Sequence, residues 1–254
     1  MEKRFYNFTD FFEWYMRKAT VKYGTEAEIY KLDGEVYKVF NSSFGERNEE
    51  SIETIGKMNS KYLTIPTCLL YLGFEYYGFV MDDAGDDLKT ILNNQDLSFD
   101  KKYDILNQLR EGLLYLEEMG TPHGDLSISN ILYDGEYVRI GDVNNLIIED
   151  SSKRLNYCGR SWFDAYGSYK TVDRLAYNLL TYLLLNFSTY DIRELIQYEK
   201  ANPAVFRKCL LDRPNVVFKP EIWVGYEQEL LRGNKLILEN KNIDKDIFLI
   251  DYLK

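Results

Sequence analysis

Three polar side chains separated by short intervals could together perform chemistry in this sequence. Asp125 and Asn130 lie in the stretch HGDLSISNIL, and Asp142 follows in the segment IGDVN. Carboxylate and amide oxygens are ligands suited to a hard cation such as Mg²⁺. A chain that turns back through a hairpin would bring Asn130 and Asp142 together, although they are twelve residues apart. The pattern therefore predicts a cation site close to a further carboxylate.

The elements that must position these residues divide the chain into a strand-rich first part and a helix-rich second part. Residues 21–40 alternate in polarity and contain the turn pair Asp33-Gly34, which predicts two or three antiparallel strands. Further strands are expected over 69–74, 76–81, 131–133 and 137–140, and helices over 9–18, 48–58, 87–92, 101–119 and from about 173 onward. Segregated elements of this kind predict an α+β fold.

The stretch HGDLSISNIL resembles the catalytic loop of the protein kinase superfamily, whose commoner form in protein kinases is H-R-D-L-x-x-x-N. The segment GDVN resembles the metal-binding D-F-G segment of the same family. The resemblance implies that Asp125 accepts the proton of an acceptor hydroxyl, while Asn130 and Asp142 hold Mg²⁺. It gives His123, the only histidine of the chain, a structural hydrogen-bonding role. Asp173 would brace the catalytic loop through the loop's backbone.

The same resemblance implies a bilobal, ATP-binding fold in which residues 1–254 form one domain. A small antiparallel N-lobe with one main helix would span about 1–82, and a larger, mostly helical C-lobe about 83–254. Lys38, in the segment VYKVF, resembles the lysine of the family's third strand, which contacts the α and β phosphates. Gly24 is the one glycine kept from the phosphate-binding G-x-G-x-x-G loop, so modest phosphate affinity is expected.

The family pairs this lysine with a glutamate on the following helix, and the sequence offers several candidates. Glu50 is the favoured partner, followed by Glu53, with Glu49 as a third possibility. Ungapped counting falls on Ser51, which leaves the choice open among neighbouring positions. Each of these acidic residues could equally be a solvated side chain on the outer face of a helix.

The segment YGFVMDDAGDDL, residues 77–88, resembles the hinge between the two lobes and the short helix after it. The resemblance places Met81 at the gatekeeper position. It also implies that the backbone of residues 82–84, which include Asp83, hydrogen-bonds adenine, and that Asp87 faces the ribose. The alternative interpretation is an acidic loop in contact with solvent.

Several positions depart from the family pattern. Gly124 replaces the arginine on which an activation-loop phosphate docks, so switching by that route is not expected. Val143 replaces the phenylalanine of D-F-G, and residues 160–165 do not match the A-P-E tripeptide that anchors the peptide-binding segment. By contrast, the segment FRKCLLDRP, residues 206–214, resembles a late C-lobe motif of protein kinases.

These features predict an ATP- and Mg²⁺-dependent Ser/Thr protein kinase that phosphorylates itself or another protein. The HGD motif and the missing A-P-E tripeptide leave open a small-molecule kinase similar to the aminoglycoside phosphotransferases. The depleted glycine loop leaves open a pseudokinase that acts as a nucleotide-binding scaffold.

Composition excludes other classes of function. A net charge of −10 disfavours a broad nucleic-acid surface and an anionic membrane face, since both need clustered Lys and Arg. Three scattered cysteines, with no metal-binding spacing, predict a reducing compartment and no disulfide framework. No apolar signal core follows the N-terminal residues and no apolar run is long enough to cross a bilayer, so a cytoplasmic location is expected.

Overall fold

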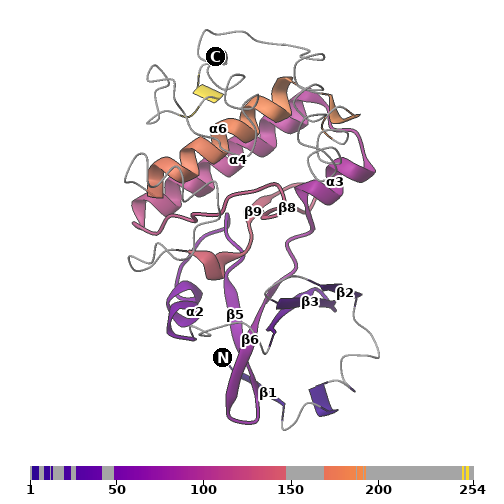
Figure 1. The fold of residues 1–254 in the computed structure, drawn as a ribbon, viewed down its shortest axis with the longest axis vertical. Coiled ribbons are helices and arrows are strands. Elements are labelled where there is room, and N and C mark those ends of the chain that lie inside the picture. Colours follow the sequence, from indigo (N-terminus) through magenta and orange to yellow (C-terminus); the bar gives the residue numbers. More distant parts are fainter. Residues whose placement is uncertain are drawn as a thin grey trace. The chain divides into compact units, whose positions relative to one another are not determined.

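The computed structural model describes residues 2–5, 9–11, 13, 20–23, 27–41, 49–146, 169–186, 188–190, 192, 248, 250 and 251. The chain divides into two compact units, Met1–Gly85 and Asp86–Lys254, which are described separately below. The first unit contains a strand-rich sheet and the second is mostly helical, which confirms the α+β fold (Figure 1). Within the described ranges, no helix has the length and apolar character needed to span a membrane.

The first unit is built on a six-stranded sheet. Its strands, in spatial order, are β1 (Glu2–Phe5), β5 (Pro66–Leu72), β6 (Glu75–Asp82), β4 (Glu35–Phe40), β3 (Ala27–Leu32) and β2 (Thr20–Tyr23). Neighbouring strands are antiparallel, except that β1 pairs with β5 in parallel. The predicted antiparallel strands are therefore confirmed, whereas β1 was not predicted from the sequence.

Two local features fix the registers of this sheet. Asp33 and Gly34 join β3 to β4 with φ angles of 52° and 84°, the left-handed conformation that a two-residue hairpin turn requires. On β6, a Cβ atom added at Gly78 would lie 1.9 Å from the carbonyl oxygen of Lys38. A glycine is therefore needed where β6 passes beside Lys38.

An aromatic core covers one face of the sheet. Its buried members are Phe11, Tyr30, Tyr37, Val39, Cys68, Leu70 and Val80. Phe11 comes from the N-terminal segment, where residues 9–11 and 13 are helical and residues 14–18 of the expected helix lie outside the described ranges. Its ring meets Phe5 and Tyr30 edge to face, with centroids 5.1 and 6.1 Å apart. The N-terminal segment thus packs on the sheet of its own chain.

The second unit is organised around two long helices. It comprises β7 (Asp86–Asp87), α3 (Leu88–Asn94), α4 (Phe99–Glu118), β8 (Ile131–Tyr133), β9 (Val138–Ile140) and α6 (Tyr169–Asn186). The helix α4 starts at the N-cap Ser98 and buries the predicted stripe of Ile105, Leu109, Leu113 and Leu116. The helix α6 runs beside it in Figure 1, and Tyr177 of α6 donates to the carbonyl of Leu106 at 3.0 Å. The strands β7, β8 and β9 form a small antiparallel sheet.

Candidate active site

The loop that carries Asp125 is anchored by a buried carboxylate. Asp173, in the first turns of α6, accepts hydrogen bonds from the backbone N–H groups of His123 at 2.6 Å and Gly124 at 2.8 Å. Burial raises the pKa of Asp173 to about 6. At neutral pH the carboxylate is ionised and both of its oxygens accept, which is the bracing role that the resemblance implies for this residue.

His123 is locked in one tautomer by its neighbours. Its Nε2 lies 2.9 Å from the carbonyl oxygen of Gly141, which can only accept, so Nε2 carries the proton. Its Nδ1 then accepts the backbone N–H of Asp125 at 3.2 Å. Because both ring nitrogens are occupied and the side chain is buried, His123 holds the loop in place and does not act as a base.

The loop and the hairpin bring Asn130 next to Asp142. The amide nitrogen of Asn130 donates to the carbonyl of Asp125 at 2.8 Å, which fixes the orientation of the side-chain amide. The backbone carbonyl of Asn130 accepts a hydrogen bond from the N–H of Gly141 at 2.7 Å. Asp142 is the next residue after Gly141, so its backbone lies close to Asn130. The hairpin of β8 and β9 therefore produces the proximity expected from the sequence.

Asp142 has an unusual backbone conformation. Its φ of 56° and ψ of 38° are left-handed, a region that non-glycine residues seldom occupy. The residue immediately precedes a short 3₁₀ turn, Val143–Asn145, in which Val143 is completely buried. Strain of this kind is retained where the surrounding structure fixes a side chain for function.

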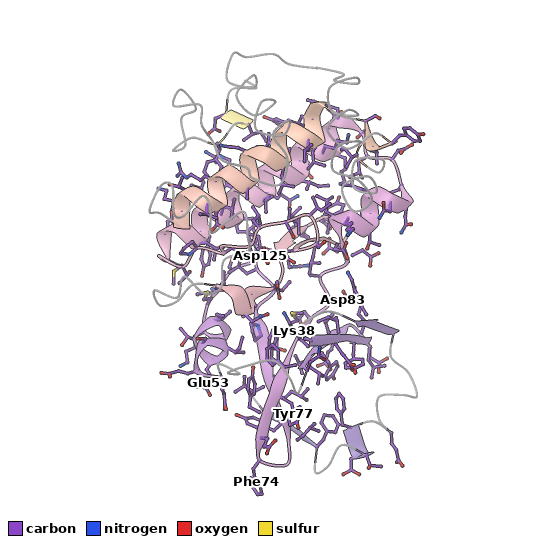
Figure 2. The ribbon with its side chains drawn as sticks, viewed as in Figure 1. Lys38, Glu53, Phe74, Tyr77, Asp83 and Asp125 are labelled. Carbon is purple, nitrogen blue, oxygen red and sulfur yellow. The ribbon has the colours of Figure 1, made fainter. Side chains whose placement is uncertain are left out.

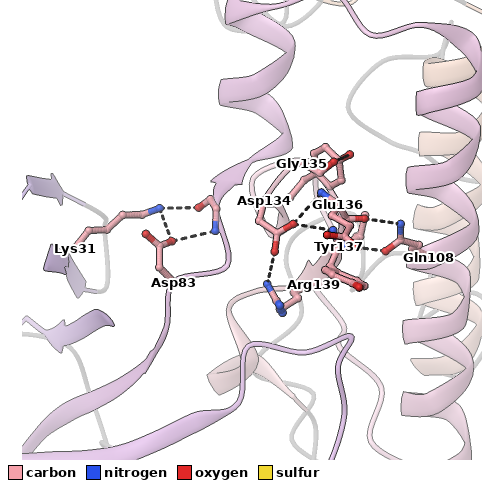
Figure 3. A network of polar contacts seen from close by, with 11 residues as sticks. Lys31, Asp83, Gln108, Asp134, Gly135, Glu136, Tyr137 and Arg139 are labelled. Atoms are coloured by element: carbon pink, nitrogen blue, oxygen red, sulfur yellow. Dashed lines mark hydrogen bonds and ion pairs between the residues drawn. The ribbon is translucent and has the colours of Figure 1, made fainter. Parts of the chain in front are cut away.

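Side chains of α4 hold the far end of the hairpin, as the close view in Figure 3 shows. Gln108 accepts the backbone N–H of Val138 at 2.9 Å and donates to the carbonyl of Glu136 at 3.0 Å. Asp134 accepts the N–H groups of Glu136 and Tyr137 within the turn. Sequence reasoning did not identify Gln108, because a polar residue on an amphipathic helix gives no sign of a bond made 28 or more residues away.

In the first unit, Lys38 lies on β4 with its side chain almost fully buried, at 6% exposure (Figure 2). It is opposite Ile29 of β3 and Phe79 of β6 in the strand register. Burial of a lysine among strands needs a compensating partner or ligand. The burial of Lys38 therefore differs from the exposure of a solvated lysine on a strand.

The acidic candidates are on the helix α2 (Glu49–Gly56), which packs on β5 through its buried Ile52 and Ile55. Glu50 and Glu53 are exposed, and helical geometry puts Glu50 on the side opposite the two isoleucines. Glu49 flanks the buried side and accepts a hydrogen bond from the hydroxyl of Tyr71 on β5. The pairing of Lys38 with Glu50 stays a prediction, as does its pairing with Glu53 or Glu49.

The hinge segment uses Asp83 internally. Met81 is buried at the end of β6, while the carboxylate of Asp83 forms an ion pair with Lys31 at 2.8 Å and its backbone N–H donates to Gly34 at 2.9 Å. Asp87 caps α3, accepting from the N–H and hydroxyl of Thr90. Contacts of Asp83 and Asp87 with a nucleotide stay predictions, and both carboxylates already have structural partners.

Other predicted features fall where the structure gives no description. Gly24 and residues 160–165 and 206–214 lie outside the described ranges. Among the described residues, no group of three or more His, Cys, Asp or Glu side chains could hold a metal ion. A cation between Asn130 and Asp142 would therefore need further ligands from a substrate or from water.

Part of the chain is similar to a known protein family. A model of the family "Protein tyrosine and serine/threonine kinase" matches residues 61–156, a range that contains Asp125, Asn130 and Asp142 but not Lys38. Over 81 residues the chain is 38% identical to protein L268 of Acanthamoeba polyphaga mimivirus, which bears the name of a serine/threonine-protein kinase. That alignment spans 31% of this chain and 15% of the viral protein.

The fold has a counterpart among solved structures. A crystal structure of Rad53 1–466 in complex with AMP-PNP matches with a TM-score of 0.52 and 16% sequence identity. The match covers 91% of this chain and 62% of that one. The likeness confirms the kinase-like α+β fold that was expected from the sequence.

Proposed function

We propose that the chain, which matches a protein kinase family model over residues 61–156 and has a kinase-like fold, is an ATP- and Mg²⁺-dependent phosphotransferase acting on a Ser or Thr hydroxyl, of itself or of another protein. The observation that carries the proposal is the anchored catalytic loop. Asp173 and His123 bind the backbone N–H groups that lead into Asp125, and Asn130 donates to the carbonyl of Asp125. The β8–β9 hairpin joins Asn130 to the residue before Asp142.

Each side chain then has a distinct task. Asp125 orients the acceptor hydroxyl and accepts its proton as the hydroxyl oxygen attacks the γ-phosphorus and ADP leaves. Lys38 binds the α and β phosphates of ATP. Glu49 or Glu50 holds that lysine in position. Rate enhancement arises mainly from positioning and charge neutralisation, because phosphoryl transfer needs little covalent assistance from the protein.

The residues of the loop fit a magnesium ion. The amide nitrogen of Asn130 is committed to the carbonyl of Asp125, so the amide oxygen is the end that can bind a cation. Asp142 would add a carboxylate oxygen, and oxygen ligands of this kind suit Mg²⁺. Mg²⁺ held there would neutralise charge on the phosphate oxygens. Few protein ligands are needed, since phosphates and water normally complete its coordination.

The decisive experiment is mass spectrometry of the purified chain after incubation with Mg²⁺ and ATP. The wild type is expected to gain phosphoryl groups, and Asp125→Asn to lower the rate about 10²- to 10⁴-fold, the usual contribution of a positioned acid or base. Lys38→Ala should abolish the gain of phosphoryl groups. Asp100→Asn, which alters an exposed carboxylate of α4, serves as the matched control. A wild-type rate in Asp125→Asn would overturn the assignment.

A pseudokinase is the second candidate, and the exposure of Glu50 favours it. With Glu50 exposed to solvent, the chain could bind nucleotide without turnover. Titration with AMP-PNP separates the two cases when no phosphoryl gain is found. Binding without transfer to the chain itself or to a panel of proteins and small alcohols would establish the pseudokinase.

A further inference from the structure

A lysine ties the hinge segment to strand β3. The ammonium of Lys31 donates to a carboxylate oxygen of Asp83 at 2.8 Å and to the carbonyl oxygen of Gly85 at 2.6 Å (Figure 3). The same oxygen of Asp83 accepts the N–H of Gly85 at 3.0 Å, which closes a turn in which Gly85 has a φ of 88°. Residues 83–85 are therefore held from two directions, by their own turn and by Lys31.

The backbone of the hinge has a defined direction. The N–H of Asp83 donates to the carbonyl of Gly34, in the turn before β4, at 2.9 Å. In a trans peptide the C=O and N–H bonds point in opposite directions, so the carbonyl of Asp82 points away from β4. The carbonyl oxygen of Asp82 is therefore not used by β4.

Lys31 also shares a face of the sheet with Lys38. In the register of β3 and β4, Lys31 is opposite Val36 and Ile29 is opposite Lys38, so both lysines project to the same face. A second unneutralised ammonium on this face would compete with Lys38 for phosphate. The carboxylate of Asp83 offsets that charge. The ion pair therefore directs an anionic ligand toward Lys38.

We propose that Lys31 is a positioning residue for nucleotide, which through Asp83 and Gly85 presents the carbonyl of Asp82 to the amino edge of adenine. The proposal rests on the proposed function, since it assumes that the hinge binds a nucleotide. It assigns Asp83 a role different from the one expected from the sequence. Asp83 holds the hinge in place, and the carbonyl of Asp82 contacts the base.

The test is titration calorimetry of the full chain with AMP-PNP and GMP-PNP in the presence of Mg²⁺. Lys31→Met is expected to weaken AMP-PNP binding about threefold to tenfold, the range for a partly exposed charge-assisted contact, and to reduce the preference for adenine. Lys31→Arg, which keeps the charge, should restore part of the affinity. Lys57→Met, an exposed lysine of the same unit, is the matched control and should bind as the wild type does.

The outcomes separate this inference from the proposed function. Unchanged affinity and adenine preference in Lys31→Met, with a wild type that binds AMP-PNP, would overturn the role of Lys31 alone. A wild type that binds neither nucleotide would overturn both the proposed function and this role. Thermal unfolding of each variant identifies a general loss of structure, and Asp83→Asn then provides the second variant, with the same expected direction as Lys31→Met.

Discussion

The loop of Asp125 in the second unit, the proposed catalytic loop, is held by buried groups, whereas the proposed hinge of the first unit is held by half-exposed ones. Asp173 and His123 are 3% and 1% exposed, while the side chains of Lys31 and Asp83 are 35% and 32% exposed. A hydrogen bond to a buried charge contributes more than an exposed ion pair, because water competes less for the partners. We therefore expect the loop to keep a single conformation. The hinge is held in its conformation more weakly.

Among the groups that hold these two segments in place, the largest effect should come from removing the buried charge. Asp173→Asn loses one of the two acceptors that hold His123 and Gly124, and should lower kcat by about 10²-fold, in keeping with the loss of a charge-assisted bond in a buried network. The wild-type rate should also fall as the pH decreases through about 6, because burial raises the pKa of Asp173 to that value and protonation turns one acceptor into a donor.

Folding should show the opposite pH trend for the same group. Its native pKa of about 6 exceeds the ordinary value of 3.8, so the folded chain binds this proton more tightly than the unfolded chain does. Its contribution to the free energy of unfolding is therefore largest below pH 3.8 and decreases as the pH rises to about 6. Rate and urea-unfolding profiles of wild type and Asp173→Asn check both signs. If the rate of Asp173→Asn falls at acid pH as much as the wild-type rate does, Asp173 is not the group that causes the fall.

The next effect concerns the first unit, whose sheet depends on its N-terminal cover. Phe11→Ala should lower the free energy of unfolding by about 3–5 kcal/mol, since it empties a space in the aromatic core. Phe74→Ala, at the β5–β6 turn where the side chain is 96% exposed, should change it by less than about 0.5 kcal/mol. Urea unfolding of both variants gives the comparison. Equal losses would show that Phe11 does not stabilise the sheet.

The smallest expected effect distinguishes the acidic residues of α2. Glu50→Gln should change the rate less than about twofold, as for most exposed surface substitutions, whereas Glu49→Gln also weakens the bond with Tyr71 and should lower it further. Steady-state rates at saturating ATP provide the measurement. A larger loss in Glu50→Gln than in Glu49→Gln would support Glu50 as the partner of Lys38.

Local signals in the sequence predicted much of the fold. The Asp33-Gly34 turn, the apolar stripe of α4 and the hairpin after Asn130 each depend on neighbours a few residues apart, and the structure contains all three. The order of Asp125, Asn130 and Asp142 was enough to indicate the kinase family whose model matches residues 61–156, because the spacing of these residues reflects one loop and one hairpin. The roles of these residues stay predictions until the variants are measured.

Nonlocal pairing was decided only by the tertiary structure. The strand β1 pairs in parallel with β5, more than sixty residues away, and a parallel pair leaves no turn signal between its strands. Lys31 meets Asp83 across 52 residues, and the side of α2 that faces β5 separates Glu49 from Glu50. The sequence by itself determined which elements form and which residues could do chemistry. Which charges meet, and which stay in water, depended on how distant strands and helices pack, because a side chain's partner is set by geometry in space and not by its neighbours along the chain.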